Sequence, residues 1–215
     1  MADTEIMLRK LLLVGGILSS LIYVFTDIFG GLIWGNYDFT SQYISELGAI
    51  GAPSRPLVIP LYIVYDVLIA AFGLGVWRYA DGIRKIHFTG GLLIGYMIIG
   101  AVGLFFPMNP GEDATSLTNI MHQLLAGVTV VLILLSIGFT AIVFGTHFRV
   151  YSIGTILVYL VLGALPFLGV AQVEAGEPTP WVGLVERIMV YGYMLWVAVL
   201  ASVLLRTEKV PNLIG

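Results

Sequence analysis

The stretch NIMHQLLAGVTVVLILLSIGFTAIVF, at residues 119–144, contains no Asp, Glu, Lys or Arg. A helix needs about 20 predominantly apolar residues to cross the hydrocarbon core of a bilayer, and this stretch is longer than that. A membrane barrel strand needs only about 10 residues, and an open sheet edge cannot satisfy its backbone groups in lipid. The stretch therefore predicts a transmembrane helix.

Further apolar stretches of similar length occur on both sides of it. Of the 215 residues, 59% are hydrophobic and 11% are charged, whereas soluble domains have about 25% charged residues. We predict an all-α fold, a polytopic transmembrane bundle of six helices that forms a single integral membrane domain over residues 1–215. The predicted spans are residues 11–34, 57–77, 88–106, 119–144, 150–172 and 180–205.

The basic residues predict how this bundle is oriented. Lys and Arg near the ends of spans are retained on the cytoplasmic side of a membrane. In the six-span arrangement, only Arg55 and Arg187 fall on the opposite side. We therefore expect a multi-pass protein of the cell membrane with both termini in the cytoplasm. The basic residues expected on the cytoplasmic side are Arg9, Lys10, Arg78, Arg84, Lys85, Arg149, Arg206 and Lys209.

The longest connection between spans runs from Gly35 to Pro56 and is expected on the outer side. Within it, the segment TSQYISEL, at residues 40–47, places Tyr43, Ile44 and Leu47 at helical spacing, and Gly48 follows as a stop signal. We predict a short interfacial helix in this outer loop.

Ionisable side chains inside the predicted spans require an explanation. Inserting one charged side chain at the centre of a transmembrane helix costs about 3 kcal/mol or more. Asp66 lies near the middle of the second span and His122 lies about one turn into the fourth. Asp66 is either part of a cavity or proton relay, or a protonated carboxyl bonded to a neighbour such as Tyr62. His122 is either a functional base or a hydrogen-bonded packing residue.

Glu186 and Arg187 lie about two turns into the sixth span. Adjacent helical residues diverge by about 100°, so we expect each side chain to find its partner on a different helix. Arg187 would suit Asp27, Glu46 or a lipid phosphate, and the structural alternative is an interhelical salt bridge that fixes the register of two helices.

These residue types allow several kinds of chemistry. Ser45, His122 and Asp66 could supply a nucleophile, a base and an acid, and are the candidate catalytic residues. The candidate ligand-binding residues are Glu46, Arg55, Glu186, Arg187 and Asp27. The chain has no cysteine, and His122 has no partner in an HxxxH or HExxH pattern, so we expect no metal site. Haem would require a second transmembrane histidine, so we expect no cofactor.

Three motifs coincide with these polar features: SQYISELGAIGAPSRP at residues 41–56, FPMNPGEDATSLTNIMH at residues 106–122, and GLVERI at residues 183–188. In these motifs the chain resembles the six-helix membrane proteins of domain of unknown function 998. The resemblance implies a fold rather than an activity, and it points to Ser45, Glu46, Gly48, Pro107, His122, Glu186 and Arg187. A looser similarity is to alkaline ceramidases, but the chain lacks the paired histidines of those zinc hydrolases.

We therefore expect an outward-facing polar pocket that binds a membrane lipid headgroup or another small amphiphile. One alternative is a membrane-embedded hydrolase of a lipid ester or amide with His122 as base, and a second is a proton-coupled transporter that uses Asp66. The predicted outer half is acidic, which either favours cationic ligands or reflects only the exclusion of Lys and Arg from outer loops. The net charge of -3 predicts no nucleic-acid partner, and no pattern indicates an oligomeric state.

Overall fold

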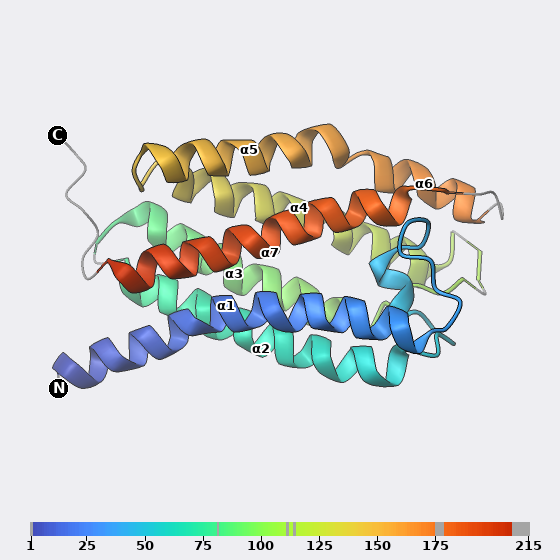
Figure 1. Ribbon diagram of the computed structural model, residues 1–215, viewed down its shortest axis with the longest axis horizontal. Coiled ribbons are helices and arrows are strands. Elements are labelled where there is room, and N and C mark those ends of the chain that lie inside the picture. Colours follow the sequence, from blue (N-terminus) through green and yellow to red (C-terminus); the bar gives the residue numbers. More distant parts are fainter. Residues whose placement is uncertain (1, 81, 111, 114, 175–178, 208–215) are drawn as a thin grey trace.

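The computed structural model describes residues 2–80, 82–110, 112–113, 115–174 and 179–207. Within these residues the fold is all-helical, and six helical segments are long and apolar enough to cross a membrane. The helices run nearly parallel to the long axis of the molecule, as Figure 1 shows. The predicted fold class, a transmembrane helical bundle, is confirmed.

The observed helices match the predicted spans to within a few residues, except at the start of the first and in the fifth. The first begins earlier than predicted, at Ala2, and the fifth is divided in two. The helices are α1 (Ala2–Ile33), α2 (Arg55–Tyr79), α3 (Arg84–Gly103), α4 (Leu117–Ala141), α5 (Thr146–Leu162), α6 (Leu165–Glu174) and α7 (Val182–Arg206). The assignment of all of them to one membrane domain stays a prediction.

The division of the fifth span has a local cause. Helix α5 ends at Leu162, and α6 begins at Leu165, directly before Pro166. Proline lacks a backbone N–H, and its ring clashes with the carbonyl four residues earlier, which is that of Leu162. The predicted fifth span, residues 150–172, therefore consists of two helices, although the apolar segment Thr146–Gly169 is still long enough to cross a membrane.

Helices α1 to α5 pack side by side in chain order, and α7 closes the bundle by packing against α1 and α5. Two glycines show how closely the helices approach. A Cβ atom on Gly15 would lie 2.7 Å from the Leu68 carbonyl oxygen, and one on Gly90 would lie 2.7 Å from the Trp77 nitrogen. Such contacts between backbones replace the hydrophobic effect as the source of helix association in lipid.

Helix α1 begins and α7 ends at the same end of the bundle (Figure 1). Near this end the Arg9 guanidinium lies 5.2 Å from the centre of the Tyr79 ring. The Tyr79 hydroxyl in turn donates a hydrogen bond of 2.9 Å to the Thr207 carbonyl. The predicted basic side is therefore one physical end of the molecule, except that Lys209 lies outside the described residues. Which side of the membrane it faces stays a prediction.

The first long loop contains the expected short helix, and it forms a 3₁₀ helix, η1 (Ile44–Gly48). It is shorter than the predicted segment of residues 40–47, and it ends at Gly48 as predicted. Ile44 and Leu47 are only 1% and 0% exposed. Helix η1 packs against α1, α2 and α7, so it fills the end of the bundle with its apolar side chains.

We predict that Gly90→Ala destabilises the protein by about 1–3 kcal/mol, because the added methyl group would meet the backbone of α2. The control is Gly138→Ala on α4, where a Cβ atom would meet no other atom within 4 Å. The measurement is the free energy of unfolding in mixed micelles. Equal stability of the two variants would contradict the close approach of α2 and α3.

We also predict the orientation of the bundle from single cysteine variants, which are unambiguous because the chain has no cysteine. Asp113 is exposed in the connection between α3 and α4, and Thr146 is exposed at the start of α5, at the basic end. A membrane-impermeant maleimide should label Asp113→Cys in intact cells and Thr146→Cys only after permeabilisation. The reverse pattern would overturn the predicted orientation.

Candidate functional site

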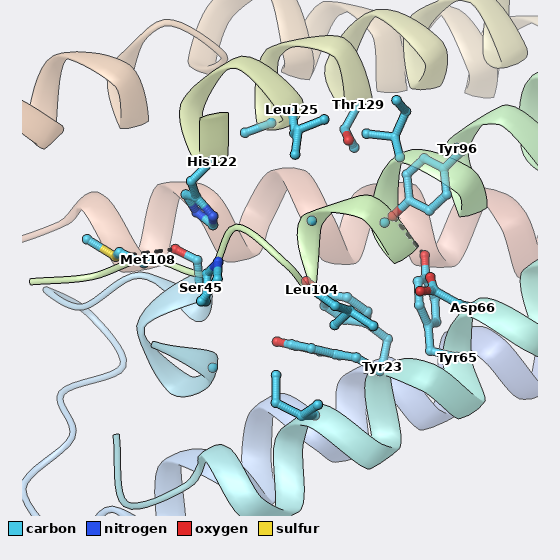
Figure 2. A pocket seen from close by; sticks show the side chains of 18 of the residues that line it. Tyr23, Ser45, Tyr65, Asp66, Tyr96, Leu104, Met108, His122, Leu125 and Thr129 are labelled. Atoms are coloured by element: carbon cyan, nitrogen blue, oxygen red, sulfur yellow. Dashed lines mark hydrogen bonds between the residues drawn. The ribbon is translucent and has the colours of Figure 1, made fainter. Parts of the chain in front are cut away.

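A cavity of about 240 Å³ extends from η1 into the bundle. Helices α1, α2, α3, α4 and α7 all contribute to its wall. Figure 2 shows His122 and Ser45 toward one end of the cavity, and Asp66 with Tyr65 and Tyr96 toward the other. The cavity therefore connects the polar loop region with the middle of the spans.

The cavity brings together half of the candidate site residues predicted from the sequence. Ser45, Asp66, His122 and Glu186 all line it. The other four candidates do not, and each of them binds another part of the protein. They are Glu46, Arg55, Arg187 and Asp27.

Asp66 is the most deeply placed of the lining acids. It lies about 16 Å along α2 from Arg55, at 1.5 Å per residue. The residue is 8% exposed, and its carboxyl group has neither a hydrogen bond nor an ion pair within the described part of the chain. Gly100 makes room for it, because a Cβ atom there would lie 2.8 Å from the Asp66 Oδ1. The expected bond to Tyr62 is not among the hydrogen bonds formed by the described residues.

His122 is oriented by the chain segment before α4. Its Nδ1 lies 3.1 Å from the Phe106 carbonyl oxygen. Because a carbonyl can only accept, Nδ1 must carry the proton of this hydrogen bond, and in the neutral ring Nε2 is then the acceptor. His122 thus brings a lone pair to the cavity wall.

Ser45 and His122 share the cavity without forming a hydrogen bond to each other. The Ser45 hydroxyl donates to the Met108 Sδ at 3.8 Å, and the His122 Nδ1 is taken by Phe106. Nucleophilic catalysis requires the base within hydrogen-bond reach of the hydroxyl, although such contacts are often looser before substrate binds. The geometry as it stands does not assemble a Ser–His pair.

The two glutamates of the site have different roles. Glu46 caps η1, because its Oε1 accepts the N–H of Tyr43 and its Oε2 accepts from the Gln42 amide. The Oε2 of Glu186 accepts the N–H of Ile44 at 2.6 Å, whereas its Oε1 has no partner within the described residues. Of these two glutamates, Glu186 is thus the one that lines the cavity and keeps a carboxylate oxygen without a partner among the described residues.

Arg187 forms a buried ion pair with Asp27 across α7 and α1. Its Nε and Nη2 donate to the two carboxylate oxygens at 2.9 and 2.8 Å, and the side chains are 8% and 0% exposed. Tyr191 donates to the same carboxylate at 2.5 Å. Each of the two residues thus finds a partner on a different helix, as expected: Arg187 pairs with Asp27 on α1, and Glu186 accepts from Ile44 at the start of η1.

The remaining donors of Arg187 fix the first long loop. Its Nη1 donates to the carbonyls of Phe39 and Gln42, and its Nη2 also donates to the Tyr37 hydroxyl at 2.6 Å. The Tyr37 hydroxyl donates in turn to the Tyr43 carbonyl. Burial raises the pKa of Tyr37, which keeps this hydroxyl protonated and able to donate.

The rest of the loop is held by further polar contacts at its two ends. Hydrogen bonds from the Thr40 hydroxyl and N–H and from the Ser41 hydroxyl lower the pKa of Asp38 to about 2, so Asp38 stays ionised. At the other end, the Ser54 hydroxyl donates to the Leu47 carbonyl, and Arg55 donates to the Gly48 carbonyl. Arg55 thus closes the loop onto the start of α2.

Tyrosines form a part of the cavity wall that the sequence analysis missed. Tyr23, Tyr62, Tyr65 and Tyr96 come from α1, α2 and α3. The ring centres of Tyr23 and Tyr65 lie 5.0 Å apart, and the Tyr65 hydroxyl donates to that of Tyr96 at 2.8 Å. The sequence feature that could have identified these tyrosines is their position inside apolar spans, because a hydroxyl group in lipid requires a polar partner.

Metal binding has little support within the described residues. No three His, Cys, Asp or Glu side chains there form a group that could hold a metal ion. The absence of a metal site, which was expected from the lone outer histidine, stays a prediction.

Comparison with known proteins identifies the family. The model of the protein family described as "protein of unknown function (DUF998)" matches residues 17–203. This chain belongs to the DUF998 family. The match covers Ser45, Asp66, His122 and Glu186, so the whole cavity wall lies inside the family region. No curated protein and no solved structure shows a significant match to the chain.

We predict that Asp27→Asn destabilises this DUF998 protein by about 3–5 kcal/mol, because the Arg187 guanidinium would remain buried without a counter-charge. The matched control is Asp113→Asn, which changes an exposed acid in the same way. The measurement is the free energy of unfolding in mixed micelles.

A double variant, Asp27→Leu with Arg187→Met, should recover part of the stability that Asp27→Asn loses, because it removes both charges together. A loss in Asp27→Asn no greater than that in Asp113→Asn would show that the pair is not desolvated.

Proposed function

We propose that this multi-pass membrane protein binds a small amphiphile in the cavity beneath η1. The observation that carries the proposal is the composition of the cavity wall, which joins ionisable groups to an apolar surface. Ser45, His122 and Glu186 supply polar atoms, and the apolar part includes Ile99 and Leu125. An amphiphile matches both parts of such a wall.

The size of the cavity limits what it accepts. Pockets for drug-sized ligands have volumes of about 300–1,000 Å³. At about 240 Å³, this cavity is smaller than that range. It therefore suits a headgroup and the first carbons of a chain, with the rest of the molecule lying outside it.

The N–H groups of Arg187 are already hydrogen-bonded within the protein, so Arg187 is not available to bind a ligand. A lipid phosphate bound by Arg187 was one expectation from the sequence. The guanidinium is instead paired with Asp27 and with loop carbonyls, and it does not line the cavity. The proposal therefore rests on the cavity alone and needs neither Arg187 nor Arg55 as a ligand-binding residue.

Binding is also better supported than hydrolysis. The hydrolase hypothesis depends on a hydroxyl within hydrogen-bond reach of the His122 base. Ser45 donates to Met108 instead, and His122 is anchored by Phe106. Ligand binding requires only the cavity and its polar atoms.

We predict that Gly103→Leu weakens amphiphile binding by about tenfold, because a side chain there would occupy part of the cavity that the ligand needs. Gly103 lines the cavity, and a Cβ atom on it would meet no other atom within 4 Å, so the change should not disturb the helix packing. Gly138→Leu is the control, because that glycine is equally open and does not line the cavity.

The measurement is isothermal titration calorimetry of the protein in nanodiscs with octyl amphiphiles that carry a neutral, an anionic or a cationic headgroup. At least one should bind with saturation to the unaltered protein and to Gly138→Leu. If none saturates, or if Gly103→Leu binds as well as Gly138→Leu, the proposal fails.

A further inference from the structure

We propose that the headgroup held in this cavity is an organic cation, an ammonium group placed beside Asp66 among tyrosine rings. The inference rests on the proposed function and names the class of its ligand. It depends on the charge of the wall, on one unpartnered carboxyl and on the aromatic surface.

The buried carboxyl group of Asp66 is the feature that indicates a bound ligand. It is 8% exposed, it lines the cavity, and it has no polar partner within the described residues. Buried ionisable groups are normally paired or hydrogen-bonded, since an unpaired one is costly to desolvate. A bound cation would supply the counter-charge that none of the described residues provides.

The rest of the wall favours the same sign of charge. Glu186 adds a second carboxylate, of which only Oε2 is taken by the Ile44 N–H. His122 contributes an acceptor, because its proton lies on the Nδ1 that donates to Phe106. Among the described residues that line the cavity there is no Lys and no Arg. An anionic headgroup would therefore meet carboxylates without any fixed positive charge.

The tyrosine rings supply the surface that a substituted ammonium prefers. The rings of Tyr23 and Tyr62 are stacked with centres 5.7 Å apart, and Tyr65 meets Tyr23 edge-on at 5.0 Å. Aromatic faces attract cations within about 6 Å of the ring centre, and clusters of such rings recognise quaternary ammonium groups. Figure 2 shows Tyr65 and Tyr96 beside Asp66 at the deep end of the cavity.

A bare metal ion fits this wall less well. No group of three His, Cys, Asp or Glu side chains that could hold a metal forms within the described residues. Small cations also require several oxygen ligands at short range, whereas much of this wall is aliphatic or aromatic. An ammonium group on an apolar chain satisfies both the charge and the surface.

The test compares amphiphiles that have the same octyl chain and differ in the charge of their headgroup. Octyltrimethylammonium, octyl sulfate and octyl glucoside are titrated into the protein in nanodiscs of uncharged lipid, and binding is measured by calorimetry. We expect saturable binding of octyltrimethylammonium at least about tenfold tighter than that of the other two. Dihexanoylphosphatidylcholine is a fourth probe, which separates a lipid headgroup that contains ammonium from a free alkylammonium.

The variants Asp66→Asn and Glu186→Gln keep the size of each side chain and remove its charge. Asp66→Asn should weaken binding of the cationic probe at least about tenfold. Glu186→Gln should weaken it less, because one oxygen of the Glu186 carboxylate is already bonded to the Ile44 N–H. Glu112→Gln, an exposed acid outside the cavity, should bind as the unaltered protein does. Thermal unfolding of each variant verifies that it is folded.

The outcomes separate this inference from the proposed function. If the glucoside or the sulfate binds as tightly as the ammonium and Gly103→Leu abolishes that binding, the cavity is an amphiphile site and the cation inference is wrong. If Asp66→Asn is folded and binds the ammonium unchanged, Asp66 is neutral in the protein and the inference is again wrong. If no probe saturates, the proposed function itself fails. Binding of either ammonium probe that depends on Asp66 supports the inference.

Discussion

The ion pair between Arg187 and Asp27 organises the polar end of this bundle. A guanidinium in a span is tolerated only where its charge and its donors are matched. Here Asp27 supplies two oxygens, and the loop and the Gly183 carbonyl supply the other acceptors. The carbonyls of Phe39 and Gln42 reach Arg187 only if the loop turns back over the bundle. One desolvated charge thus determines the path of a segment far from it in the sequence.

The path of that loop shapes the cavity. Arg187 holds residues 37–43 in place. As a result, the Ile44 N–H is in position to donate to Glu186, which is next to Arg187 on α7. Helix η1 then places Ser45 and Gly48 in the cavity wall, while Ile44 and Leu47 are buried. The structural ion pair and the candidate site are therefore neighbours with separate roles, and the loop joins them.

The sequence predicted the spans because lipid imposes one strong requirement, long apolar helices, that is visible in composition alone. It did not reveal the break within residues 150–172, where hydropathy is continuous but Pro166 cannot continue the backbone hydrogen bonding of α5. The cavity was harder to predict. Asp66 and His122 stood out individually, but their sharing of one space depends on how α2 and α4 rotate about their axes. That rotation is set by packing such as the close contact at Gly90, which no local pattern reports.

The adjacent residues Glu186 and Arg187 show why chemical type alone does not identify a site. The two differ by about 100° around α7, so one side chain turns toward α1 and the other toward the cavity. The residue with the larger and more obvious charge, Arg187, is fully engaged in structure, whereas Glu186 retains a carboxylate oxygen without a partner among the described residues. The same contrast separates Asp27, which is paired, from Asp66, which has no partner in the part of the chain that the structure describes. In a membrane bundle it is therefore the incompletely satisfied ionisable group beside open space, rather than the most charged one, that indicates where a ligand binds.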